Sequence, residues 1–150
     1  MKKIILSFLL LSSCTVLFAQ HRRDNNNPPQ TIQQAWQKDH PNQTPATWQQ
    51  SNGQWHAHYK DNTSSRDADS YYDPRGRQLA THMQWDRTQL PSDYDRTIRT
   101  RYHANNYSVT RIERPNQSGL YQLIMQLTGG KTRTVYTDER GNEVRYRRTY

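Results

Sequence analysis

Apolar residues early in the chain follow first a helical and then a strand-like spacing. Ile32, Ala35 and Trp36 fall at i, i+3 and i+4, which predicts a short helix with one apolar face. Pro29 stands near its start, where proline is tolerated, and Pro41 stands just beyond its end. Because the residue before a proline avoids helical backbone, the helix should end before Pro41.

Alternation of apolar and polar residues then predicts four short strands. Trp48 lies in the first strand, and Asn52-Gly53 forms the tight turn to the second. A polar loop leads to a third strand that ends at Tyr72, and the fourth ends near Trp85. The second strand has two different faces, which are formed by Trp55, Ala57 and Tyr59 and by His56, His58 and Lys60.

A turn of the form D-x-x-G occurs once in each half of the chain. It lies within YYDPRGRQL, residues 71–79, and again within VYTDERGNEV, residues 135–144. The aspartate at the first position accepts hydrogen bonds from N–H groups of the turn. The glycine at the fourth position adopts backbone angles that other residues rarely adopt. Asp73 and Asp138 are therefore predicted to be equivalent residues of two copies of one unit.

The second half repeats the order of the first. Ser92 is the expected N-cap of a helix with acidic residues in its first turn. A shift of 66 positions places Gly53 on Gly119 and keeps the inward parity of the strand that follows. The expected apolar positions are Tyr94, Ile98 and Tyr102 of the helix and Tyr121, Leu123, Met125 and Leu127 of the strand. Strands are predicted at 109–114, 119–127, 132–137 and 143–150.

These patterns predict an α+β fold built as a tandem repeat. Each unit consists of one helix and four antiparallel strands, and the units span residues 29–90 and 91–150. A unit of about 60 residues is only marginally stable alone, so the two are expected to share one larger sheet. Few aliphatic side chains are available, and the core must therefore rely on tyrosine and tryptophan.

The amino terminus carries an export signal. Two lysines, an uncharged apolar run and Ala19 before a polar stretch predict a signal peptide over residues 1–19. Residues 20–28 are polar and have no periodic pattern, which predicts a disordered leader. We expect a periplasmic or secreted protein, with a lipoprotein anchored at Cys14 as the alternative, because Leu-Ser-Ser-Cys also fits a lipidation signal. Cys14 is the sole cysteine, so cleavage after Ala19 excludes disulfides and cysteine-ligated zinc.

The basic charge is unevenly distributed. The chain has a net charge of +8, which becomes +6 once the two lysines of the signal leave. Residues 29–90 contain equal numbers of basic and acidic side chains, whereas residues 91–150 contain eleven basic and six acidic ones. This uneven charge gives information about the binding partners of the protein and not about its fold. Export disfavours nucleic acid, so an envelope protein or an anionic envelope component is the expected partner.

The order of these elements resembles the PepSY-like and beta-lactamase-inhibitor-like (BLIP-like) envelope proteins of Gram-negative bacteria. The resemblance rests on the G-x-W-x-A-x-Y strand, the two D-x-x-G turns, the "LP" before the second helix and the G-x-Y-x-L strand. It implies two helices on one face of a curved antiparallel sheet whose other face is free. In the beta-lactamase inhibitor itself that concave face grips an enzyme, and the family offers no catalytic motif to carry over.

The sequence contains little catalytic chemistry. His56 and His58 have a spacing that allows two imidazoles to bind one metal ion, with His82 or Asp69 as a third ligand. Two exposed polar residues on a solvated sheet face are the alternative interpretation. No nucleophile with a base and no phosphate loop is evident, and the close carboxylate pair Asp67 and Asp69 lies in a predicted loop that leads into a strand, so we expect no enzyme and no cofactor.

The predicted binding face combines residues of both halves. On the last predicted strand Arg145 and Arg147 share one face with Thr149, while Val144, Tyr146, Arg148 and Tyr150 share the other. The candidate binding residues are His56, His58, Ile124, Arg145 and Arg147. They predict a non-catalytic exported binding module. Inhibition of a periplasmic protease or other envelope hydrolase is the alternative, and a metal-dependent enzyme is a weaker one.

Overall fold

The computed structural model of the chain describes residues 27–43, 47–127 and 129–148. The predicted signal peptide, the alternative lipidation site at Cys14 and the predicted leader up to residue 26 lie outside these ranges. Within the described residues the chain forms two α-helices, one short 3₁₀-helix and one seven-stranded sheet. The predicted α+β class is therefore confirmed.

The sheet is antiparallel throughout, and each strand pairs with its neighbours in the sequence. Its strands are β1 (Thr47–Ser51), β2 (Gln54–Lys60), β3 (Asp67–Tyr72), β4 (Gln78–Trp85), β5 (Tyr107–Arg114), β6 (Gln117–Gln126) and β7 (Thr132–Thr137). Strands β4 and β5 pair from Thr81–Glu113 to Trp85–Val109, and this pairing joins the two halves into one sheet. A shared sheet is what we expected, because each half alone would be only marginally stable.

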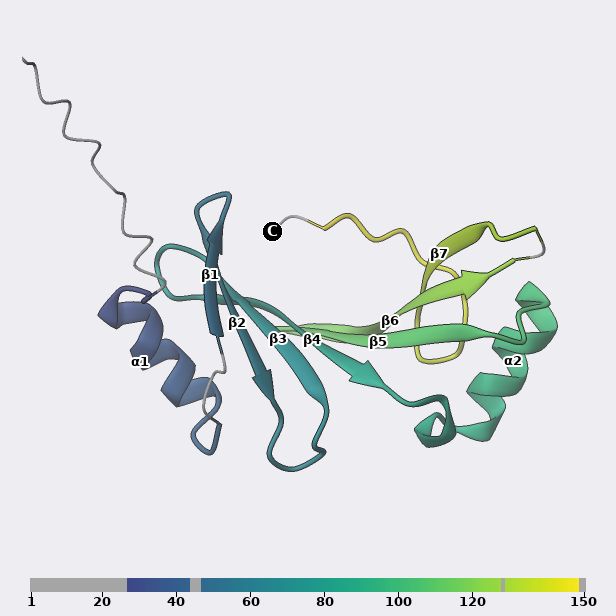
Figure 1. The fold of residues 1–150 in the computed structure, drawn as a ribbon, viewed down its shortest axis with the longest axis horizontal. Coiled ribbons are helices and arrows are strands. Elements are labelled where there is room, and N and C mark those ends of the chain that lie inside the picture. Colours follow the sequence, from purple (N-terminus) through teal and green to yellow (C-terminus); the bar gives the residue numbers. More distant parts are fainter. Residues whose placement is uncertain (1–26, 44–46, 128, 149–150) are drawn as a thin grey trace, which may run out of the picture.

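Both helices pack on the same face of the sheet. Helix α1 (Gln30–Asp39) buries Ile32 and Trp36 against β2 and β3, and helix α2 (Ser92–Tyr102) buries Tyr94 and Ile98 against β5 to β7. The strand register places the two contacted surfaces on one side, and Figure 1 shows the helices at the two ends of a bent sheet. This arrangement is the one that the family resemblance implies.

Each D-x-x-G turn lies against the helix of its own half. Gly76 has φ +79°, and a Cβ atom there would lie 3.1 Å from the carbonyl oxygen of Thr31 in α1. Gly141 has φ +80°, and its Cβ would lie 3.0 Å from Cγ2 of Thr97 in α2. A glycine is therefore required twice, both for its backbone conformation and for close approach to a helix.

The described residues beyond β7, up to residue 148, do not form the predicted eighth strand. Among them Glu143 alone forms a bridge, to Thr137, and the Val144 N–H donates to the Tyr136 carbonyl oxygen at 2.8 Å. Residues 143–148, which we call the C-terminal strap, leave the sheet edge and run over the face opposite the helices (Figure 1). Apolar residues on that face give the strap a better contact than an unsupported edge position would.

Four further expectations need correction. The first half has four strands and the described second half has three, so two matching four-stranded units are not found and the tandem repeat stays a prediction. Gly53 occupies a turn at φ +75°, whereas Gly119 lies inside β6. The residue preceding α2 is Pro91, so Ser92 is not the cap, and Leu127 lies beyond the end of β6 and is exposed.

Candidate functional site

The face of the sheet opposite the helices carries most of the polar strand residues. Pairing aligns His58 with Asp69 and Asp69 with His82 across three adjacent strands, and it aligns His56 with Tyr71. We call this surface the helix-free face. Its residues include His56, His58, Asp69, Tyr71, His82, Ile112, Gln122, Ile124 and Tyr136.

The C-terminal strap covers part of the helix-free face. Val144 and Tyr146 pack on a buried cluster that contains Ile112 and Leu120. The ring of Tyr146 lies 4.7 Å from that of Tyr136, and the Arg114 guanidinium lies over it at 5.4 Å. The expectation of a fully open sheet face is therefore wrong, because the chain's own C-terminal segment occupies its middle.

The end of the strap reaches the first half of the sheet. The guanidinium of Arg148 lies 4.9 Å from the centre of the Tyr71 ring, a distance suited to a cation–π contact. Tyr71 also stacks almost parallel on His56 at 4.7 Å and contacts His82 at 5.0 Å. One tyrosine thus connects the strap to the histidines of β2 and β4.

Asp69 joins the two histidines of β2. Its Oδ1 atom lies 2.9 Å from Nε2 of His56 and 2.7 Å from Nδ1 of His58, so a single carboxylate oxygen serves both rings. Burial acts to raise the pKa of Asp69, but the two imidazole hydrogen bonds outweigh it and hold the pKa below its ordinary value. The Asp69 side chain is therefore a fixed anion between two imidazoles.

His82 differs from these two histidines. Burial, followed by the nearby positive charge of Arg148, lowers the pKa of His82 to about 4. The ring is thus neutral at physiological pH and packs beside Tyr71 as an aromatic group. The positions of His82 and Arg148 are linked by this electrostatic contact as well as by their shared tyrosine.

The proposed metal ligands come together only in part. Asp69 does contact His56 and His58, but the imidazole nitrogen that each histidine would offer to a metal ion already bonds Oδ1 of Asp69. Across the part of the chain that the structure describes, no group of three or more His, Cys, Asp or Glu side chains is placed to hold a metal ion. The arrangement favours a polar surface cluster.

The five predicted binding residues lie on one side of the molecule without forming one cluster. His56 is on β2 and Ile124 is on β6, with three strands between them, which corresponds to about 19 Å at the usual strand spacing. Ile124 is exposed, as expected. Arg145 and Arg147 are exposed on the outer side of the strap, while Val144 and Tyr146 turn inward.

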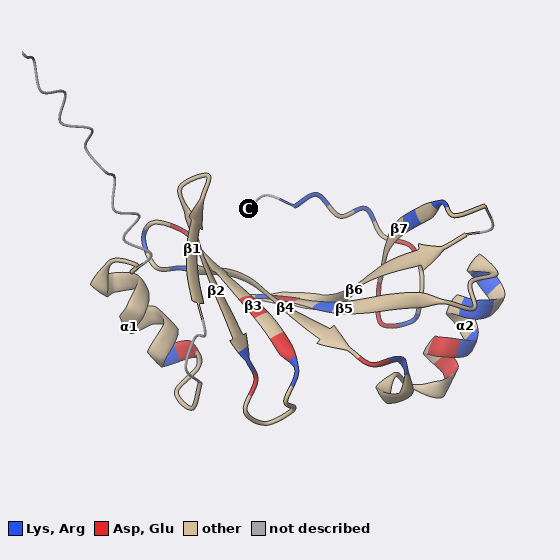
Figure 2. Ribbon diagram, in the orientation of Figure 1, with Lys and Arg blue, Asp and Glu red and all other residues tan. Residues whose placement is uncertain are grey.

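Many arginines of the second half already have partners. The contacts are Arg96–Asp93 at 3.3 Å, Arg99–Asp95 at 2.8 Å, Arg111–Glu113 at 2.9 Å, Arg111–Glu139 at 3.2 Å and Arg101 to the Gly141 carbonyl oxygen at 2.6 Å. Arg145 and Arg147 form no ion pair with any described residue. Figure 2 shows basic residues along the strap without acidic residues between them.

Sequence reasoning missed three residues of this surface. Tyr71, Tyr146 and Arg148 connect the strap to the sheet, yet none was a candidate. The inward parity of Tyr146 and Arg148 was visible in the alternation of the last eight residues. That pattern indicates an extended segment, but it does not say whether the segment joins a sheet edge or lies across a sheet face.

Comparison with known proteins shows the fold. A DUF2874 family protein from Bacteroides ovatus matches with a TM-score of 0.72 and 16% identity over 79% of this chain and 86% of the other. A BLIP-like protein from Bacteroides fragilis matches with a TM-score of 0.69 and 24% identity over 79% and 84%. A candidate periplasmic protein from Bacteroides eggerthii matches with a TM-score of 0.70 and 15% identity over 79% and 87%.

Sequence comparison adds no family. No protein-family model matches the chain, and no curated protein gives a significant match. At these identities the structural neighbours establish a shared BLIP-like fold. In the described residues, neither helix is long and apolar enough to cross a membrane.

Proposed function

We propose that this chain is a non-catalytic exported binding module that engages an acidic envelope protein through the helix-free face and the C-terminal strap. The observation that carries the proposal is the unpaired charge of Arg145 and Arg147. These arginines stand on the outer side of the strap, while many others of the same half are neutralised within the fold. Arginine recognises carboxylates with two parallel hydrogen bonds.

The surroundings of the strap suit a protein partner. Exposed Ile124 adds an apolar contact on the same face, and the half-buried rings of Tyr136 and Tyr146 add aromatic surface. Interfaces are enriched in tyrosine and arginine, which bury large areas and still offer polar atoms. The His56–Asp69–His58 group is the outer polar margin of this surface, because its three side chains are only partly buried.

The export pattern at the amino terminus supports a location in the periplasm or outside the cell. The alternative of a lipoprotein anchored at Cys14 places the same binding face at a membrane surface. Either location provides acidic proteins, so the chemistry of the proposed partner does not depend on the choice.

The test compares capture from an envelope extract by the full chain and by a double variant, Arg145→Glu with Arg147→Glu. We expect one protein to be retained at low salt, released at high salt and lost in the variant, because exposed charges are screened by salt. A variant with Arg96→Glu and Arg140→Glu changes the net charge equally on other surfaces. Equal retention by the two variants would refute the proposed face.

A second function, inhibition of an envelope hydrolase, is favoured by the BLIP-like fold of the Bacteroides fragilis neighbour. An inhibitor would present the same helix-free face to the rim of an active site. A panel of periplasmic proteases and lactamases tests it directly. Inhibition that the double variant abolishes would support this function, and no inhibition at micromolar protein would count against it.

A further inference from the structure

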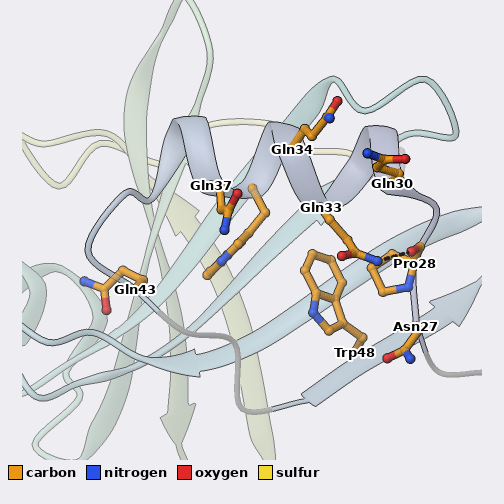
Figure 3. A pocket seen from close by; sticks show the side chains of 9 residues that line it. Asn27, Pro28, Gln30, Gln33, Gln34, Gln37, Gln43 and Trp48 are labelled. Atoms are coloured by element: carbon orange, nitrogen blue, oxygen red, sulfur yellow. Dashed lines mark hydrogen bonds between the residues drawn. The ribbon is translucent and has the colours of Figure 1, made fainter.

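A second surface of the molecule lies on the helix-covered side, between α1 and β1. It is a hollow of about 500 Å³, within the range of about 300–1,000 Å³ that is usual for small-ligand sites. Figure 3 shows Trp48 of β1 facing the helix across this space, with Gln33 and Gln37 on the side of α1 that turns toward it. The hollow is separate from the helix-free face, because Trp48 shares the orientation of the buried residue Ala57.

The lining of this hollow is unusual in containing many amides and no charge. Six of its nine residues are asparagine or glutamine, and the other three are Pro28, Trp36 and Trp48. A site for an anion or cation would need opposite charge, and a site for a wholly apolar ligand would need a mainly apolar lining. An amide group, in contrast, offers two donors and an acceptor in a fixed plane.

Some of these amides are held in place and others are available. Gln33 donates from Nε2 to the Pro28 carbonyl oxygen at 2.7 Å. This hydrogen bond fixes the side chain and leaves its amide oxygen as an acceptor. Gln43 is fixed by a bond to Asp61 at 2.8 Å and by the Asn62 N–H at 2.9 Å. Gln37 is exposed and makes no hydrogen bond to a described residue.

The two tryptophans add an apolar wall and an unused donor. Trp48 is only half-buried, and its ring meets that of Trp36 edge to face at 5.7 Å. Trp36 is 3% exposed, and its buried indole N–H has no hydrogen-bond partner among the described residues. The indole N–H of Trp36 is thus a hydrogen-bond donor without a protein partner in the wall of the hollow, and a polar group of a ligand would satisfy it.

From this combination we infer that the hollow between α1 and β1 binds a neutral oligosaccharide. A sugar ring has an apolar face of C–H groups, which suits the indole of Trp48, and a rim of hydroxyl groups. Each sugar hydroxyl can donate and accept a hydrogen bond. The side chains of Gln33 and Gln37 offer both an NH₂ donor and a carbonyl acceptor to such hydroxyls. A glycan is also a ligand that an exported protein encounters, and binding it requires no charge.

The test is titration of the full chain with a panel of neutral oligosaccharides, made of α- and β-linked hexoses and N-acetylhexosamines, followed by NMR of the tryptophan indole N–H groups. We expect at least one to move the signals of Trp48 and Trp36 in a saturable way while the signal of Trp85, which packs against the core under α2, stays in place. No saturable change of the Trp48 signal with any member of the panel up to roughly 10 mM, the weak end of specific binding, would overturn the inference.

Variants then assign the binding to this hollow. Gln37→Ala should weaken binding about fivefold, the effect of one hydrogen bond, and it should not unfold the helix, because alanine is the best helix former. Trp48→Ala should abolish binding and Trp48→Phe should restore part of it. Gln49→Ala is the control, because Gln49 is the next residue of β1 and faces the other side of the sheet. Equal affinities of Gln37→Ala, Trp48→Phe and the unmodified chain would place the sugar elsewhere.

Because this hollow and the strap lie on opposite faces, the two proposals fail separately. Loss of sugar binding in Gln37→Ala should leave protein capture unchanged, and the Arg145→Glu, Arg147→Glu variant should keep its sugar affinity. A shared loss in both assays would contradict the assignment of two independent surfaces.

Discussion

Replacing Arg148 by alanine should raise the pKa of His82. The structure places the Arg148 guanidinium on one tyrosine, Tyr71, whose ring also contacts His82. After burial, the positive charge of Arg148 is the next largest cause of the low pKa of His82, which lies at about 4. Removing the charge, and opening the surface to water, both favour the protonated ring.

The size of the effect follows from the geometry. Arg148 lies 4.9 Å from the Tyr71 ring centre and His82 lies 5.0 Å from it, so the two charges are at most about 10 Å apart. At that distance the repulsion is about 0.4 kcal/mol in bulk water and about 1.7 kcal/mol at an effective dielectric constant of about 20. The pKa of His82 should therefore rise by about 0.3 to 1.2 in the variant.

The assay is an NMR titration of the histidine ring signals in the full chain and in Arg148→Ala. Arg145→Ala is the matched control, because it removes the same charge from the outer side of the same strap. It should change the pKa of His82 less than Arg148→Ala does. If both variants gave the same change, Arg148 would not be held against Tyr71, and the strap would not lie across the helix-free face.

Two further predictions concern the turns and the acid range. Gly76→Ala should cost about 2 kcal/mol or more in urea unfolding, because it adds strain at positive φ and a contact with the Thr31 carbonyl oxygen; Gly53→Ala, which has positive φ but open space around it, should cost about 1 kcal/mol, and equal costs would show that the helix contact is unimportant. His82 has a lower pKa in the folded chain than its ordinary 6.5, so the folded state binds fewer protons and stability should fall as the pH drops from about 6.5 to about 4. The loss should be about 1–2 kcal/mol, after allowance for partial exposure, and His82→Gln should remove it; the same pH dependence in that variant would contradict the assignment.

The sequence predicts the local structure well where the pattern has one physical solution. The alternation of Trp55, Ala57 and Tyr59 allows one face to be buried, and the structure buries all three. The D-x-x-G turns are also correct, because few residues satisfy both the hydrogen-bonding and the backbone requirements. What the pattern did not give is the reason for the turn's recurrence, which is the packing of Gly76 and Gly141 against two helices.

The errors that affect the candidate site concern contacts between segments that are distant in sequence. Alternation in the last residues predicts an extended chain, and the chain is extended enough to direct Tyr146 inward and Arg147 outward. The partner of that segment depends on Ile112 and Leu120, whose exposure on the far face becomes visible only when the sheet is assembled. In the same way, Asp69 was one of two possible third ligands, and only the strand register shows that it bonds both histidines.

The strap explains how this fold combines stability with a charged binding surface. Its inward residues, Val144 and Tyr146, cover apolar side chains that would otherwise be exposed on the helix-free face. Its outward residues, Arg145 and Arg147, have no internal role that a described contact reveals. Successive residues of an extended segment point to opposite sides, so substitutions of the two sets should have different effects. Substitutions of the inward residues should lower the stability of the fold, and substitutions of the outward arginines should weaken binding alone. A sheet whose helix-free face were simply bare would offer no such separation.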